Sequence, residues 1–174
     1  MRLDYAETNK SYIKGLAGLP SDYPVPSSEP DMLFYIQRSQ NFNTVIYQLN
    51  TTPDGFINES NPINVYWKNY ESGGEIMNIN LLQAKLAYGY AHKVINKHTV
   101  EINVVSYPSY RMMLTLVDGS YKILSKFNGR WEILTNIYVY VEDFGVFPSV
   151  KYVELYGQQQ STDLPCFERL SISE

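Results

Sequence analysis

Arg38 is the residue whose chemical type fits its sequence position least well. Phe34, Ile36 and Arg38 alternate with Tyr35 and Gln37, so a strand here would place the arginine on the same face as two apolar side chains. A guanidinium on an inner face needs a carboxylate partner, or it lines a cavity in which it can bind an anion. A third interpretation places Arg38 at the end of the strand, where its long side chain reaches water. The carboxylates considered as its partners are Glu101, Glu132 and Glu154.

Aromatic residues supply the second set of candidates. The chain has 16 Tyr, 7 Phe and 2 Trp, and several of them gather in the first half of the sequence at Tyr35, Tyr47, Tyr66, Trp67, Tyr88 and Tyr90. A tyrosine combines an apolar ring with a polar hydroxyl, which suits the recognition of sugars and peptides. The alternative is that these rings form cross-strand pairs that stabilise a sheet. Together with the arginine, they predict a ligand-binding set of Tyr35, Arg38, Tyr66, Trp67 and Tyr88.

The sequence predicts no catalytic residue, no metal site and no cofactor. His92 and His98 are the two histidines, and the single cysteine, Cys166, rules out an internal disulfide and a cysteine-built metal site. Neither a Gly-x-Ser-x-Gly nucleophile motif nor a Walker or dinucleotide-binding glycine motif occurs. Glu142 and Asp143 are adjacent, and adjacent residues of a strand point to opposite faces, so they do not form a carboxylate pair for glycoside hydrolysis.

The charge and hydropathy patterns exclude two classes of partner. A net charge of −4 and the lack of a dense Lys/Arg run argue against nucleic acid. No apolar stretch approaches the roughly 18 residues that a membrane-spanning helix needs. Residues 1–7 lack the apolar core of a signal peptide. The sequence as it stands predicts a cytoplasmic protein, with removal of an export signal from a longer precursor as the open alternative.

The sequence predicts one domain between a polar arm and a polar tail. Residues 1–30 contain four prolines, which lack the donor that a β-ladder needs, so this segment is expected to be an extended or disordered arm that lies across the domain. Residues 31–157 are predicted as a β-rich domain, and residues 158–174 as a loosely structured tail. A chain of this length buries about 70% of its surface on folding, enough for a core without metals or disulfides.

Alternating or apolar runs of strand length dominate the predicted domain. The segments are 33–38, 44–49, 63–67, 99–105, 110–117, 120–127, 130–141 and 150–156. Asp118-Gly119 and Asn128-Gly129 are strong two-residue hairpin signals. The first of these turns predicts a register that can be checked: Leu116 faces Tyr121, and Leu114 faces Ile123.

One short helix is expected over residues 80–88, capped by Asn78 or Asn80 and stopped by Gly89. The alternative is a strand over residues 86–95. The predicted fold class is therefore mainly β: a single antiparallel β-sandwich or barrel of about seven to nine strands with one short helix.

Five segments in this order resemble a known family. They are LFYIQRS at 33–39, NTVIY at 43–47, PINVYW at 62–67, AYG at 87–89 and KYVELYG at 151–157. The family is catalogued only as a domain of unknown function, number four-eight-three-three, and the resemblance runs from about residue 24 to residue 157. It implies a single β-rich domain and supplies no activity, cofactor or catalytic residue. Its members often carry export signals, and none is visible in this sequence.

Three kinds of function remain open from the sequence. The first is a non-catalytic binding module that holds a small polar or anionic ligand, a glycan or a peptide in a barrel mouth or on a sheet face. The second is an interaction or assembly protein that acts through a sheet edge or an aromatic patch, with a protein as its partner. The third is a hydrolase, which would need two titratable groups in one cleft, and the sequence reveals no such pair. The oligomeric state is not predicted.

Overall fold

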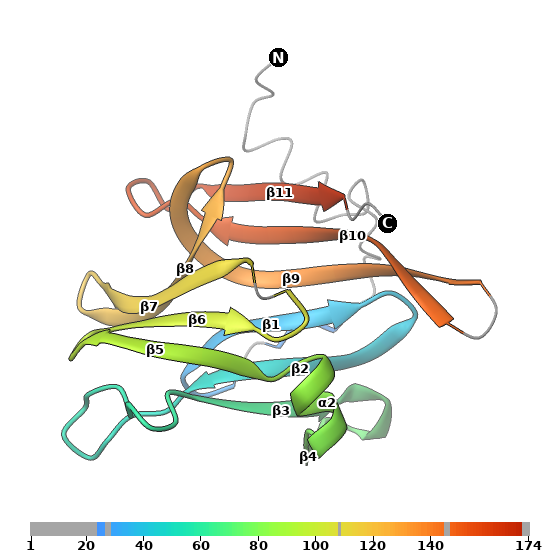
Figure 1. Cartoon of the computed structure of the whole chain (residues 1–174), viewed down its shortest axis with the longest axis horizontal. Coiled ribbons are helices and arrows are strands. Elements are labelled where there is room, and N and C mark those ends of the chain that lie inside the picture. The colour runs from blue at the N-terminus through green and yellow to red at the C-terminus, as the bar shows by residue number, and fades with distance from the viewer. Residues whose placement is uncertain (1–23, 27–28, 108, 145–146, 172–174) are drawn as a thin grey trace.

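The computed structural model describes residues 24–26, 29–107, 109–144 and 147–171. In chain order the elements are β1 (Met32–Arg38), β2 (Asn41–Leu49), β3 (Ile63–Asn69), the 3-10 turn η2 (Tyr70–Ser72), β4 (Glu75–Asn78), α2 (Leu81–Leu86), β5 (Tyr90–Asn96), β6 (Thr99–Val104), β7 (Arg111–Val117), β8 (Ser120–Phe127), β9 (Arg130–Phe144), β10 (Phe147–Gln158) and β11 (Pro165–Ser171). Strands dominate this part of the chain, and α2 is a single short helix among them (Figure 1).

The strands form one 11-stranded mixed sheet that is organised around β9. The path runs β4-β3-β2-β1-β9-β8-β7-β6-β5, and β10 and β11 extend from β9 outside this path. The strand β8 pairs with residues 130–133 of β9, β1 pairs with residues 136–139, and β10 pairs with residues 133–144. Because the long β9 has three partner strands, it joins the N-terminal and C-terminal halves of the chain.

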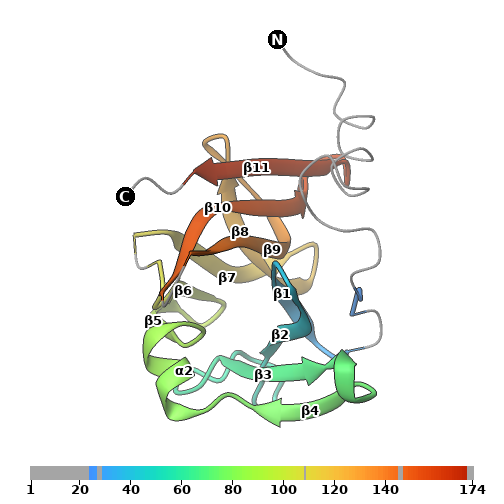
Figure 2. The same cartoon turned by 90° about the vertical axis from the view of Figure 1, so that its right-hand side faces the viewer.

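The sheet curls into a half-barrel, with β1–β3 on one wall and β5–β8 on the other (Figure 2). The alternate residues that face inward are apolar and pack into one core. Phe34, Val45, Ile102, Leu114 and Leu134 of this core are each at most 1% exposed. The curvature therefore buries the inner face of strands from both walls against each other.

Tyrosine hydroxyls join the two walls where the sheet does not close. The hydroxyl of Tyr90 on β5 donates to the backbone oxygen of Ile63 on β3 at 2.8 Å and accepts from its backbone nitrogen at 2.9 Å. Tyr47 on β2 donates its hydroxyl to the backbone oxygen of Tyr88 at 2.6 Å. These side chains satisfy backbone groups that a closed β-ladder would otherwise pair.

The predicted β-rich class is confirmed and the strand pairing is mostly antiparallel, but the described residues form 11 strands in one curled mixed sheet rather than seven to nine in a sandwich or closed barrel. The strands β4 and β11 were not expected, and β5 was considered only as an alternative to the helix. The strand β1 runs parallel to β9, with Tyr35 opposite Asn136. These two residues are separated by 101 positions, so no local turn signal predicts their pairing.

The hairpin signals and their registers are confirmed. Asp118 and Gly119 have φ values of 50° and 83°, as a two-residue turn with left-handed residues requires. Leu116 pairs with Tyr121, and Leu114 pairs with Ile123. Asn128 and Gly129 form the second turn in the same way, with φ values of 50° and 86°.

The short helix is also confirmed, and its cap is Asn80. The side chain of Asn80 accepts from the backbone nitrogen of Gln83 at 2.8 Å, and the side chain of Gln83 accepts from the backbone nitrogen of Asn80 at 2.9 Å, which completes a capping box. The backbone of Gly89, just after the helix, passes close to the backbone of Ala84. A Cβ at position 89 would lie 1.9 Å from the backbone oxygen of Ala84, so only glycine fits here. The chain then enters β5.

The described part of the N-terminal arm contacts the outer face of β1 to β3. The carboxylate of Glu29 accepts from the hydroxyl of Tyr66 at 2.8 Å and pairs with Lys68 at 2.8 Å. The side chain of Gln37 donates to the backbone oxygen of Pro24 at 2.5 Å. The prediction for residues 1–23 lies outside the described residues. At the other end of the chain, β11 adds a strand within the segment expected to be a tail.

Candidate functional site

Arg38 lies at the last position of β1, where the strand turns into β2. The ladder shifts register between Ile36 and Arg38, and Arg38 then pairs with Asn41 at the start of β2. The guanidinium forms a side-chain hydrogen bond with Tyr88. Burial raises the pKa of the Tyr88 hydroxyl, and the charge of Arg38 acts in the opposite direction. Arg38 is half-buried, and it lies at the β1–β2 turn, the end of the half-barrel that we call its mouth.

A polar cleft of about 340 Å³ opens beside Arg38. Its lining comes from the β1–β2 turn, the start of β2 and η2, and consists of Arg38, Ser39, Gln40, Asn41, Asn43 and Glu71. The turn is held by local contacts, because the backbone nitrogen of Asn43 donates to the side chain of Asn41 at 2.9 Å. A cleft of this volume lies at the lower end of the range for small-molecule sites.

The inner wall next to Arg38 is aromatic. The rings of Trp67 and Tyr88 meet edge to face with their centroids 5.2 Å apart. The indole nitrogen of Trp67 donates to the side chain of Gln83 on α2 at 3.3 Å. The structure thus brings Arg38, Trp67 and Tyr88 into contact in a chain, and of these three Arg38 is the one among the described cleft-lining residues.

The other two predicted residues, Tyr35 and Tyr66, lie on the outer face of the sheet. They pack there with Ile46 and Met32, away from the inner core. Strand alternation is the cause, because Tyr35 precedes Ile36 by one position and Tyr66 precedes Trp67. The predicted set therefore divides between two faces, and only the inner three residues belong to one neighbourhood.

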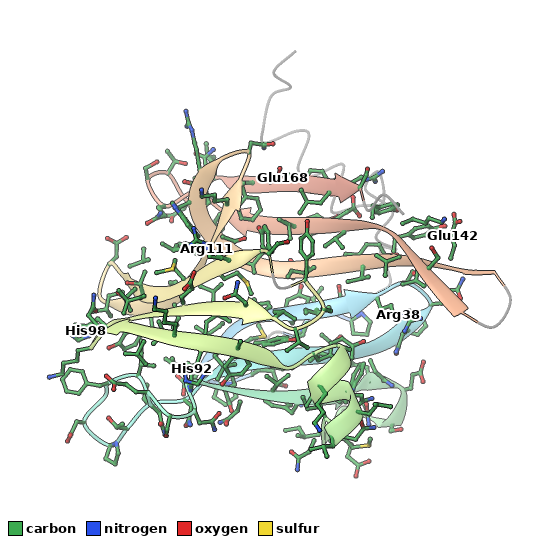
Figure 3. The ribbon with its side chains drawn as sticks, in the orientation of Figure 1. Arg38, His92, His98, Arg111, Glu142 and Glu168 are labelled. Carbon is green, nitrogen blue, oxygen red and sulfur yellow. The ribbon has the colours of Figure 1, made fainter. Side chains whose placement is uncertain are left out.

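The carboxylates considered as partners for Arg38 have other contacts. Glu101 pairs with Arg111 at 3.2 Å, and Glu132 accepts from the backbone nitrogen of Gln160 at 3.2 Å. Figure 3 shows Arg38 at the turn between β1 and β2, far from Arg111. Glu154, the third candidate, pairs with an arginine on the opposite face of the sheet from Arg38.

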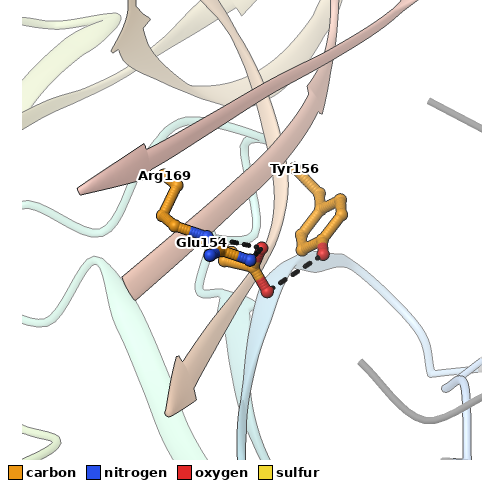
Figure 4. Close-up of polar contacts among 3 residues, drawn as sticks. All are labelled: Glu154, Tyr156 and Arg169. Atoms are coloured by element: carbon orange, nitrogen blue, oxygen red, sulfur yellow. Dashed lines mark hydrogen bonds and ion pairs between the residues drawn. The ribbon is translucent and has the colours of Figure 1, made fainter. Parts of the chain in front are cut away.

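A second polar cluster, missed from the sequence, lies on the outer face of β9 to β11 (Figure 4). Residues paired across strands share a face, and Tyr138, Glu154 and Arg169 are paired in this way across β9, β10 and β11. Glu154 is 0% exposed, and one of its carboxylate oxygens lies 3.0 Å from the Arg169 guanidinium. The other oxygen accepts from the Tyr156 hydroxyl at 3.4 Å.

Burial raises the pKa of Glu154 to about 7, although Arg169 and Tyr156 act to lower it. The guanidinium of Arg169 also lies over the ring of Tyr152 at 4.1 Å. The sequence signal for this cluster was a glutamate between two tyrosines in β10, but its partner Arg169 comes from the segment expected to be a tail. Because β11 was not predicted, the pairing of Glu154 with Arg169 could not be predicted either.

The two histidines lie away from the Arg38 cleft, as Figure 3 shows. A ring nitrogen of His92 lies 2.9 Å from the backbone oxygen of Glu59, and one of His98 lies 2.8 Å from the Tyr121 hydroxyl. Within the described ranges, no three or more His, Cys, Asp or Glu side chains are grouped to hold a metal ion. No helix in the same part of the chain is long and apolar enough to cross a membrane.

Comparison with known proteins gives one match. The sequence profile of a family described as a domain of unknown function, DUF4833, matches residues 34–169. This range begins inside β1 and ends inside β11, so it covers the whole curled sheet. No curated protein and no solved structure matches the chain.

Proposed function

The chain belongs to the DUF4833 family, and we propose that it is a non-catalytic binding module whose site is the cleft beside Arg38. The observation that carries this proposal is an arginine that a hydrophobic strand brings to the mouth of the half-barrel, where it lines a polar cleft. An arginine presents several donors in a fixed plane and suits carboxylate, sulfate, phosphate and sugar hydroxyl groups. The ligand class is a small polar or anionic molecule, a glycan or a peptide.

The surroundings of Arg38 support binding at this position. Asn41 and Asn43 line the cleft and carry amide groups that can donate to a ligand. Trp67 and Tyr88 are not among the cleft-lining residues, but their rings pack together on the inner face, and Tyr88 hydrogen-bonds Arg38 and helps to orient its guanidinium toward the cleft.

The placement of Glu154 also favours binding over hydrolysis. This carboxyl has a pKa raised to about 7, in the range useful for acid–base chemistry. It lies on the outer face, however, and does not line the cleft. Hydrolysis would need a second group beside it, and its own neighbours are Arg169 and Tyr156.

The test is a thermal-shift screen of the whole chain against sugars, organic acids, nucleotides, lipids, short peptides and divalent metals. A ligand at 100 times its dissociation constant adds about 2.7 kcal/mol, which raises the midpoint by several degrees. We expect a hit among the polar small molecules or peptides that is lost in Arg38→Ala and kept in Arg111→Ala. Arg111 is the matched control because its side chain is 69% exposed and pairs with Glu101. Hits that do not depend on Arg38 would contradict the proposed site.

A second candidate function is self-assembly through the sheet edge at β4. Four large apolar side chains are exposed on β4 and the adjoining helix, with exposed fractions of 56% for Ile76, 51% for Met77, 75% for Leu81 and 67% for Leu82. An edge strand offers unpaired backbone groups, and two antiparallel copies of one edge are self-complementary. Light scattering checks this candidate: a dimer that Ile76→Lys converts to a monomer supports it, and a wild-type monomer at all concentrations contradicts it.

A further inference from the structure

The described lining of the Arg38 cleft includes one negative side chain, and that charge restricts the ligand. Glu71 is the second residue of η2 and lines the same cleft as Arg38. Its backbone nitrogen donates to the side-chain oxygen of Asn43 at 3.3 Å, which fixes η2 beside the start of β2. A simple anion in this cleft would meet the attraction of Arg38 and the repulsion of Glu71 together.

The other described lining residues are neutral, and hydrogen bonds position Ser39, Asn41 and Asn43 among them. The side-chain oxygen of Asn41 accepts from the backbone nitrogen of Asn43, and that of Asn43 accepts from Glu71. Each of these amide oxygens is thus engaged, which leaves the NH₂ group of each side chain as the donor end. Ser39 is engaged with β9, because its hydroxyl accepts from the backbone nitrogen of Val141 at 2.9 Å.

The cleft therefore combines one cation, amide donors and one carboxylate in a volume of about 340 Å³. Donors and a guanidinium match a carboxylate on the ligand, and the Glu71 carboxylate matches an ammonium group. We infer that the ligand is a small zwitterion that carries both groups, such as an α-amino acid, with its carboxylate at Arg38 and its ammonium at Glu71. This inference rests on the proposed binding function and names the ligand class of that site.

Charge complementarity distinguishes this ligand from the alternatives. A dianionic phosphate or sulfate would gain from Arg38 but would be repelled by Glu71. A neutral sugar would make no ionic contact with either side chain. A ligand with both signs can contact both charged side chains of the described cleft lining.

The test uses titration calorimetry of the whole chain with the standard L-amino acids as probes. For each binder, the matched deaminated acid and decarboxylated amine are titrated as well. We expect at least one amino acid to bind, and both single-charge analogues to bind at least about tenfold more weakly, a loss of about 1.4 kcal/mol.

Variants assign the two charges to the two residues. Arg38→Ala is expected to abolish binding of the amino acid and of the deaminated acid. Glu71→Gln is expected to weaken the amino acid about tenfold while leaving the deaminated acid unchanged or tighter. Glu75→Gln is the matched control, because Glu75 lies nearby on β4, is exposed and is not among the cleft-lining residues. Circular dichroism and melting midpoints confirm that each variant is folded.

The results separate this inference from the proposed function on which it rests. If the deaminated acid binds as tightly as the amino acid, and Glu71→Gln does not weaken the amino acid, the zwitterion inference is wrong. In that case Arg38-dependent binding of the acid still supports a binding module. Should only a neutral glycan bind, or no amino acid at all, the zwitterion inference also fails. If no probe binds in a way that depends on Arg38, both conclusions fail.

Discussion

Arg38 and Arg169 lie on opposite faces of the same sheet and have different surroundings. Arg169 pairs at 3.0 Å with Glu154, a carboxylate that is 0% exposed, and covers the ring of Tyr152. Arg38 contacts the hydroxyl of Tyr88 and lines a cleft of about 340 Å³. The comparison teaches that the outer arginine compensates a buried charge of the fold, whereas the inner arginine presents charge at an opening.

The difference has an energetic consequence. When one partner of a buried ion pair is removed, the other charge remains in a low-dielectric setting, which costs several kcal/mol. Arg38 is half-buried, and its hydrogen bond with Tyr88 joins it to a neutral hydroxyl, so the loss of that contact is expected to cost about 0.5–1.5 kcal/mol. Stability should therefore depend on the outer arginine, and ligand binding on the inner one.

The largest expected effect is that of Arg169→Ala. This change leaves the buried Glu154 without its cation; because the Arg169 side chain is 39% exposed and solvent screens the pair, we expect a loss of about 1–3 kcal/mol in the free energy of unfolding at pH 8. The measurement is urea denaturation, with Arg111→Ala as the control for an exposed arginine, expected to change stability by at most about 1 kcal/mol. Equal effects of the two substitutions would show that the burial of Glu154 does not make its arginine more important than the partner of Glu101.

The next effect is a pH dependence that Glu154 causes. Its folded-state pKa of about 7 exceeds the ordinary value of 4.5, so the folded protein binds more protons than the unfolded chain between these values. The contribution of Glu154 to stability is therefore fully present below about pH 4.5 and is lost as the pH rises through about 7.

Glu154→Gln removes this proton linkage while it keeps a side chain that can hydrogen-bond Arg169 and Tyr156. We expect the variant to show a flatter dependence of unfolding free energy on pH between 4.5 and 7 than the wild-type chain. Denaturation curves across this range check the expectation. A wild-type slope that persists in the variant would show that another group titrates.

The smallest effect is expected from Tyr88→Phe at the cleft. The change removes the hydroxyl that hydrogen-bonds Arg38 but keeps the ring against Trp67, so the free energy of unfolding should fall by about 0.5–1.5 kcal/mol. Because the hydroxyl orients the guanidinium, we expect weaker ligand binding than in the wild-type chain. A fall above about 3 kcal/mol would mean that Arg38 and Tyr88 form a structural pair comparable to Glu154 and Arg169.

Local patterns predicted the parts of this fold that local forces determine. The Asp118-Gly119 turn fixed the pairing of Leu116 with Tyr121, because only a few turn types accept two left-handed residues. Alternation likewise predicted that Arg38 shares a face of the strand with Ile36, and that Tyr35 lies on the other face. The structure places Ile36 in the inner core and Tyr35 in the outer cluster.

What the sequence did not predict lacks a local turn signal. The parallel pairing of β1 with β9 joins segments that are far apart in the sequence, with Tyr35 opposite Asn136. The strands β10 and β11 are consecutive and form a hairpin, but the loop of residues 159–164 between them is not a two-residue turn of the kind that indicated the other hairpins. The Glu154–Arg169 pair and the approach of Glu71 to the β1–β2 turn follow from contacts without such a signal. Of the residues that line the cleft, the sequence therefore predicted Arg38, and it missed Ser39, Gln40, Asn41, Asn43 and Glu71.

The most direct test of the account is the affinity of the chain for its strongest thermal-shift hit, measured by calorimetry for the wild-type chain, Arg38→Ala and Arg111→Ala. The account predicts that Arg38→Ala binds at least about a hundredfold more weakly, a change of about 2.7 kcal/mol, while its melting midpoint stays near that of the wild-type chain. Arg111→Ala should bind as the wild-type chain does. Undiminished binding by a folded Arg38→Ala variant would contradict the central claim that the inner arginine serves a ligand.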